Sequence, residues 1–129
     1  PYLVEINLIS NLLLEYVNDY SEHPFPEYLR TGIPVALSSD DRGMWESTMT
    51  DEFYVAATEF NLSWDEIKTL GRSSLEHAFV SEENKERMLR EYNERIARFE
   101  RQMQRQGIAK LGPMPETRGF VCNRYQLCK

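Results

Sequence analysis

The sequence is poor in the residues that build metal clusters and disulfide scaffolds, with two cysteines and two histidines among 129 residues. Cys122 and Cys128 are too few for a disulfide scaffold, and their spacing, with no histidine nearby, is not that of a zinc finger. We expect no catalytic role for either thiol, and whether they form a disulfide depends on the redox state of the compartment, which the sequence leaves open.

Long apolar runs are also missing. No stretch approaches the roughly 20 apolar residues of a membrane-spanning helix, and residues 1–7 lack the basic start and apolar core of a secretory signal. We therefore expect no membrane partner. The chain is also much shorter than the about 250 residues of a closed (β/α)8 barrel, so it cannot form one by itself.

Positive charge is scarce in most of the chain. The formal net charge is −6, which argues against nucleic acid as a general partner. Residues 1–81 hold 4 basic and 14 acidic side chains, whereas residues 82–129 hold 11 basic and 7 acidic ones. Arg and Glu alternate along residues 82–105, which is typical of a solvated surface helix with ion pairs one turn apart rather than of a nucleic-acid patch.

What the sequence does contain predicts an α/β arrangement at its start. Residues 2–6 form a short β-rich run, and Ser10 and Asn11 are expected to cap a following helix of about ten residues. Residues 33–37 are almost wholly apolar, which suits a strand covered on both faces. Two strands joined through a helix make a β-α-β crossover, so we expect them to be parallel.

The rest of the chain predicts helices and a tail. Thr50 is expected to cap a helix through about residue 61, and Ser63 with Glu66 forms a capping-box pattern that opens a helix to about residue 79. Ser81 opens a long helix that ends at Gly107, and residues 108–129 are expected to be an irregular tail. One apolar stripe of the long helix predicts a packing face: Met88, Tyr92, Ile96, Phe99 and Met103.

One candidate site stands out, the pair Asp40 and Asp41, in a polar segment that follows the second predicted strand. Ligands and catalytic groups collect at the carboxyl ends of strands in α/β folds, and carboxylate oxygens bind zinc or magnesium. The alternative is a polar turn with capping residues. His23, before a proline, is expected to form local hydrogen bonds, and His77 to lie on a helix surface. Neither completes a metal site.

The order of these segments resembles the C-terminal part of the adenosine deaminase superfamily, over about residues 2–100. The resemblance rests on an ordered set of motifs: Ser10-Asn11, His23-Pro24, Gly32-Ile33-Pro34-Val35, Ser38-Ser39-Asp40-Asp41, Met49-Thr50-Asp51-Glu52-Phe53-Tyr54 and Leu70-Gly71-Arg72-Ser73-Ser74-Leu75-Glu76-His77-Ala78-Phe79. The segment from Ser74 to Phe79 is most similar to growth-factor-type adenosine deaminases.

This resemblance implies a zinc-dependent (β/α)8 barrel that hydrolytically removes the 6-amino group of a purine nucleoside. Residues 2–6 would be the seventh barrel strand and residues 33–37 the eighth. Asp40 matches the family's catalytic aspartate, which binds zinc and contacts the metal-bound water, and Asp41 matches the aspartate that hydrogen-bonds the purine ring at N7. A carboxylate beside zinc can orient a water whose pKa the metal lowers.

The sequence also departs from the family pattern. Arg42 stands where proline usually follows the aspartate pair, and Asn7-Leu8 replaces Cys-Pro or a similar pair. These changes leave the substrate preference open. The family's H-x-H pair, glutamate proton donor and two later histidines have no counterpart here, so the chain carries one of four expected zinc ligands.

We therefore interpret residues 1–107 as the C-terminal segment of a deaminase barrel, mostly helical by itself and inactive without the N-terminal strands. Its expected partners are a purine nucleoside and the rest of the barrel. The alternative is a helical interaction module without catalysis, and a hydrolase that uses only Asp40 and Asp41 is disfavoured for lack of ligands. Adenosine, deoxyadenosine or AMP as substrate, a homo-oligomer, and a cytoplasmic or secreted location stay open.

Overall fold

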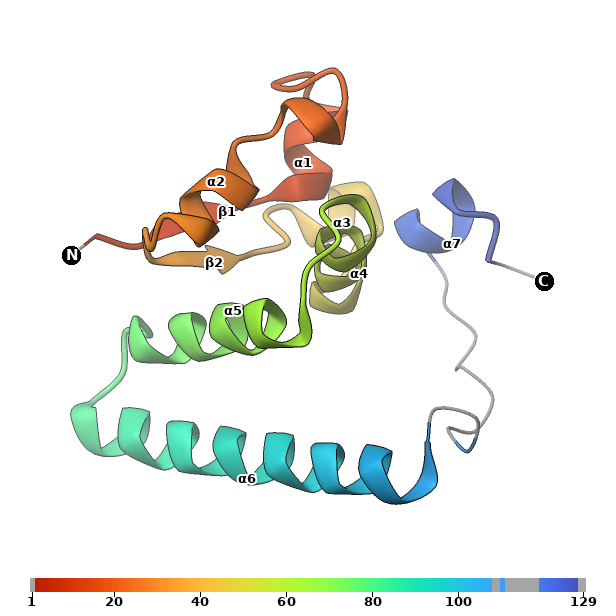
Figure 1. The fold of residues 1–129 in the computed structure, drawn as a ribbon. Coiled ribbons are helices and arrows are strands. Elements are labelled where there is room, and N and C mark those ends of the chain that lie inside the picture. The colour runs from red at the N-terminus through yellow and green to blue at the C-terminus, as the bar shows by residue number, and fades with distance from the viewer. Residues whose placement is uncertain (1, 108–109, 111–118, 128–129) are drawn as a thin grey trace.

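Two short parallel strands lie between helices in the computed structural model, which describes residues 2–107, 110 and 119–127 (Figure 1). Helices α1 and α2 lie on one side of the strands, and α5 packs on the other (Figure 1). The elements in chain order are β1 (Val4–Ile6), α1 (Leu8–Leu13), the 3-10 helix η1 (Tyr20–Glu22), α2 (Phe25–Arg30), β2 (Val35–Leu37), α3 (Arg42–Trp45), α4 (Met49–Glu59), α5 (Trp64–Glu76), α6 (Glu82–Gln106) and α7 (Phe120–Arg124).

The strands form the predicted parallel crossover. Val4 pairs with Val35 and Ile6 with Leu37, and the chain returns between them through α1, η1 and α2. Every residue of β2 is buried, as its unbroken apolar sequence predicts for a strand covered on both faces. A strand, a helical crossover and a parallel strand are the unit from which (β/α)8 barrels and other parallel α/β folds are built, so the predicted α/β class is confirmed.

An aromatic cluster anchors the crossover. The ring of Phe25, which is fully buried, lies edge-on to Phe60 with the centroids 5.3 Å apart, and Tyr20 and His23 contact the same Phe60 ring. The Phe25 N–H donates to His23 Nδ1 (3.1 Å), so the ring proton lies on Nε2, which faces Asn11 Oδ1 (2.9 Å). Burial lowers the pKa of His23, which favours this neutral form. The predicted local hydrogen bonding of His23 is confirmed.

Two predicted helix starts are wrong. Helix α1 begins at Leu8, so Ser10 and Asn11 lie inside it and do not cap it. Helix α4 begins one residue before Thr50, and its cap is Thr48. Thr48 is favoured because Asp51 stands three residues later: the Thr48 N–H donates to Asp51 Oδ2 (2.6 Å), and the Asp51 N–H donates to Thr48 Oγ1 (3.3 Å).

Other helix ends follow the sequence closely. Ser63 and Glu66 form the predicted capping box of α5, and Ser81 caps α6, which ends before Gly107. Helix α5 ends at Glu76, earlier than predicted. The tail predicted as irregular contains α7, whose first N–H donates to the Glu46 carbonyl (3.0 Å), and Cys128 lies outside the described residues.

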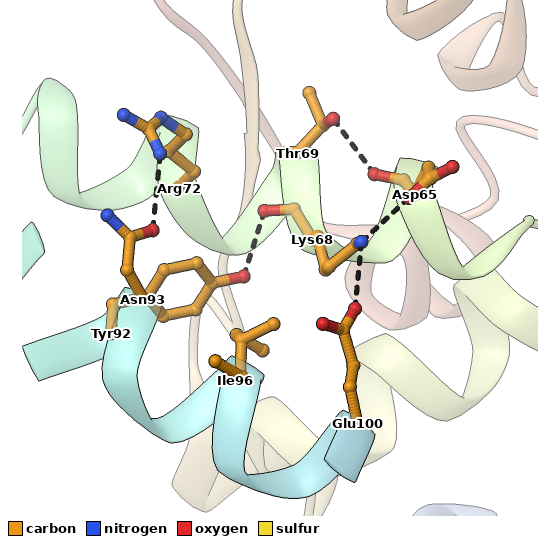
Figure 2. A pocket seen from close by; sticks show the side chains of 9 residues that line it. Asp65, Lys68, Thr69, Arg72, Tyr92, Asn93, Ile96 and Glu100 are labelled. Carbon is orange, nitrogen blue, oxygen red and sulfur yellow. Dashed lines mark hydrogen bonds and ion pairs between the residues drawn. The ribbon is translucent and has the colours of Figure 1, made fainter. Parts of the chain in front are cut away.

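Helix α6 runs alongside α5 and buries none of its residues fully (Figure 1). Tyr92 and Ile96 of its apolar stripe face α5 (Figure 2), and Phe99 lies against Trp64 with the ring centroids 5.4 Å apart. Ion pairs such as Arg87–Glu91 follow its outer surface. In the part of the chain that the structure describes, no helix has the length and apolar character needed to cross a membrane.

Gly71 provides a test of this helix pair. A Cβ built at Gly71 would lie 2.7 Å from the Tyr92 hydroxyl oxygen, which donates to the Lys68 carbonyl (2.8 Å). Alanine is favoured over glycine in an open helix by roughly 1 kcal/mol, but here we expect Gly71→Ala to lower the free energy of unfolding by about 1 kcal/mol through overpacking. Urea unfolding measures the change. In a Tyr92→Ala background the same substitution should become stabilising, and stabilisation in both backgrounds would contradict the prediction.

Candidate functional site

The candidate site lies where both strands end. Beyond the last paired residues, the Ser38 N–H donates to the Ile6 carbonyl (2.9 Å), so the pairing continues to the start of the polar segment. Asp40 and Asp41 follow two and three residues later, and both are exposed. The structure therefore brings the predicted carboxylates to the carboxyl edge of the two strands, where α/β folds bind ligands.

Asp40 has an uncommon backbone conformation, and its side chain is bound by a buried neighbour. Its φ of 49° lies in the left-handed region, which aspartate adopts more readily than most residues. The hydroxyl of Ser10, which is fully buried in α1, donates to Asp40 Oδ2 over 2.8 Å. The two residues are 30 apart in the sequence. This hydrogen bond therefore joins the connections that follow the two strands and orients the Asp40 carboxylate.

Asp41 begins the short helix α3 without using its side chain. Its carbonyl oxygen accepts hydrogen bonds from the N–H groups of Met44 (2.9 Å) and Trp45 (3.2 Å), but its carboxylate makes no capping hydrogen bond. The segment is thus a polar turn in its backbone, as the alternative interpretation predicts. The Asp41 carboxylate is exposed and is not used in capping, so it is available to a ligand at this edge.

A buried carboxylate that the sequence motifs did not single out, Glu52 of α4, lies beside the site. It is fully buried, and its two oxygens accept hydrogen bonds from the N–H groups of Leu8 (2.9 Å) and Ile9 (3.3 Å) at the start of α1. Burial raises the pKa of Glu52 to about 7 against the opposing effect of these hydrogen bonds, and the negative charges of Asp51 and Asp40 add to the increase.

One signal in the sequence could have revealed this residue. Glu52 precedes Val55 and Ala56 by three and four positions, which places it on the same, apolar face of the helix. All three side chains are buried. An acidic residue on an apolar face needs a partner, and here the N-terminus of another helix supplies it.

Asp40 is suited to the role of one metal ligand, but the described residues do not complete a site. Among them no group of three or more His, Cys, Asp or Glu side chains is placed to hold a metal ion. Both ring nitrogens of His23 are used inside the core, and His77 Nδ1 lies 3.0 Å from the Ser73 carbonyl oxygen. A catalytic zinc normally has three protein ligands, so the described residues could not hold one by themselves.

A separate groove of about 350 Å³ lies between α5 and α6 (Figure 2). Its charged groups are already paired. Lys68 contacts Asp65 (2.7 Å) and Glu100 (3.0 Å), and the Arg72 guanidinium donates to the Asn93 side chain (3.2 Å). The groove contains neither Asp40 nor Asp41, and its polar groups satisfy one another rather than facing a ligand.

The known proteins that are similar in sequence to this chain include adenosine and adenine deaminases. Residues 2–95 match a family model described as adenosine deaminase. The chain is 35% identical over 83 residues to an adenosine deaminase of Enterococcus faecalis, covering 64% of this chain and 25% of that protein. It is 36% identical over 86 residues to an adenine deaminase of Acinetobacter baylyi, covering 67% and 26%. The chain thus spans about a quarter of the length of the curated relatives it matches.

Solved structures give the same result. The crystal structure of an adenine deaminase from Arthrobacter aurescens matches with a TM-score of 0.69 and 28% identity over 74% of this chain and 29% of that one. An N6-methyl-AMP deaminase from Arabidopsis thaliana matches with a TM-score of 0.67 and 25% identity over 71% and 27%. The names of these relatives do not address the growth-factor-type subgroup, which stays a prediction.

Proposed function

The chain belongs to the adenosine deaminase family, and from this premise we propose that it is the part of a zinc-dependent purine deaminase that contributes Asp40 and Asp41. The observation that carries the proposal is the hydrogen bond from Ser10 to Asp40 Oδ2 at the carboxyl edge of the strands. It occupies one carboxylate oxygen and leaves the other to face a metal ion. The substrate class is a purine with an amino group at C6.

In this proposal each residue of the chain has a separate task. Zinc, when bound, supplies Lewis acidity that lowers the pKa of a water ligand. Asp40 would be one of the ligands, oriented by Ser10, and it would accept a hydrogen bond from the attacking water. Asp41, whose carboxylate is not used in capping, would hold the purine at N7 and fix the ring relative to Asp40.

The activity belongs to a larger assembly than these 129 residues. The remaining zinc ligands and the proton donor would come from further strands of the same barrel, on the same or another polypeptide. Pairing with those strands would also cover the open edges of the two-stranded sheet, because a two-stranded unit is marginally stable in water. By itself the chain would bind zinc weakly and turn over no substrate.

A complementation experiment tests the proposal. The 129-residue chain is assayed for zinc content and for conversion of adenosine, deoxyadenosine, AMP and adenine, alone and together with the other three-quarters of the Enterococcus faecalis relative. We expect zinc and turnover only in the mixture. Stoichiometric zinc with turnover by the chain alone would contradict the requirement for further strands.

An intact-mass measurement on the natural protein is the second arm of this experiment. A longer polypeptide or a co-purifying partner that completes the barrel and deaminates a purine would support the proposal. A natural protein that is folded, carries the missing strands and deaminates none of the four substrates would refute it and favour the interaction module.

A further inference from the structure

We propose that Glu52 is a positioning residue for Asp40, because it holds the first turn of α1 in the place from which Ser10 binds the Asp40 carboxylate. The inference rests on the proposed function, since it concerns how one ligand of the proposed zinc site is oriented. Glu52 itself would touch neither metal nor substrate. Its effect passes through two hydrogen bonds to backbone and one between side chains.

The first step is the contact between Glu52 and α1. Its Oε2 accepts from the Leu8 N–H (2.9 Å) and its Oε1 from the Ile9 N–H (3.3 Å), across 44 and 43 residues of sequence. These are the first two N–H groups of a helix of six residues. Asn7, the residue in the capping position, makes no side-chain capping hydrogen bond. Glu52 therefore replaces the local cap and ties α1 to α4.

The second step is the contact between α1 and Asp40. Ser10 follows Ile9 directly, in the turn that Glu52 holds, and is fully buried. Its hydroxyl donates to Asp40 Oδ2 over 2.8 Å. A hydrogen bond of this length tolerates little displacement, so a shift of the first turn would release the Asp40 carboxylate from Ser10.

Apolar packing alone does not account for a carboxylate at this position, because two N–H groups of α1 need an acceptor there. Glu52 lies on the same buried face of α4 as the core residues Val55 and Ala56. Burying a carboxylate there is unfavourable, as the raised pKa of Glu52 reflects, and the negative charge of Asp40 adds to the cost. An apolar side chain would fill the space but would leave the two N–H groups without this acceptor.

The test uses the catalytically complete protein of the complementation experiment. Glu52→Gln keeps the shape but loses the charge and the symmetric pair of acceptors. We expect its affinity for zinc, measured by competition with a chelator, to fall about tenfold or more, as is typical when an outer partner of a ligand is lost. The turnover number should fall with it, while KM for the nucleoside stays within about twofold. In zinc-free protein, amide exchange at Leu8 and Ile9 should accelerate.

Asp51→Asn is the matched control. Asp51 is a second buried carboxylate in the first turn of α4, but its side chain hydrogen-bonds to Thr48 of its own capping box and, among the described residues, to no residue of α1. When Asp51→Asn and Glu52→Gln lose equal thermal stability, Asp51→Asn should still leave zinc affinity and amide exchange in α1 unchanged. The double variant of Glu52→Gln with Ser10→Ala should lose no more zinc affinity than the larger single variant, because both act through one path.

The outcomes separate the two proposals. If the complete wild-type protein neither binds zinc nor deaminates, the proposed function fails. If wild type is active and Glu52→Gln keeps wild-type zinc affinity, or if its loss adds fully to that of Ser10→Ala, the positioning role alone is refuted. If Glu52→Gln does not fold, Ser10→Ala is the deciding variant. Unchanged zinc affinity in Ser10→Ala would contradict the orientation of Asp40 through Ser10, and a loss of about tenfold would support it.

Discussion

Asp40→Ala is expected to remove zinc binding and deamination from the complete protein, with a fall in turnover of roughly a thousandfold or more, since a metal's stabilisation of developing charge is worth several kcal/mol. Asp40 has the geometry for this role: it is exposed at the carboxyl edge of the strands, with one oxygen already held by Ser10. Zinc content measured beside steady-state kinetics provides the readout.

The neighbouring carboxylate should behave differently. Asp41→Ala is expected to retain zinc, because its assigned role is to bind the purine, and to lower kcat/KM by about 10- to 100-fold, the equivalent of one charge-assisted hydrogen bond. Asp65→Ala, which removes an exposed carboxylate paired with Lys68, is the control and should change neither quantity. Equal loss of zinc in the Asp40 and Asp41 variants would show that the two roles are assigned wrongly.

Phe25→Ala is expected to be the most destabilising truncation in the crossover, with a loss of about 3–5 kcal/mol in the free energy of unfolding. The Phe25 ring is fully buried against Phe60 and His23, and its N–H donates to the His23 ring. Removing the ring leaves a cavity between α2 and the residues that follow α4. A loss of this size is a large part of the 5–15 kcal/mol that stabilises a typical domain.

The control for this prediction is the same substitution at an exposed site. Phe79 is fully exposed between α5 and α6, so Phe79→Ala should shift stability by no more than about 0.5 kcal/mol. Urea unfolding of both variants, followed by tryptophan fluorescence in the complete protein, measures the difference. Indistinguishable midpoints for the two variants would contradict the assignment of Phe25 to the core.

Family membership and fold class were predictable because they depend on ordered local motifs. The resemblance to adenosine deaminases is confirmed by a family match over residues 2–95. The roles of Asp40 and Asp41, and the division of the chain at residue 107, stay predictions. The short helix α7 was not expected because the tail has no apolar period, and its contact with Glu46 is distant in sequence.

By itself, the sequence determined the features whose interactions span only a few residues. The capping box of Ser63 and Glu66 and the stop of α6 at Gly107 depend on neighbours within one turn, and the unbroken apolar run of β2 is itself local, although the elements that cover it are not. Only the tertiary structure decided where α1 begins and what holds Asp40. Those outcomes depend on Glu52 and Ser10, whose partners lie 44 and 30 residues away and are brought together when the strands pair and α4 packs on α1.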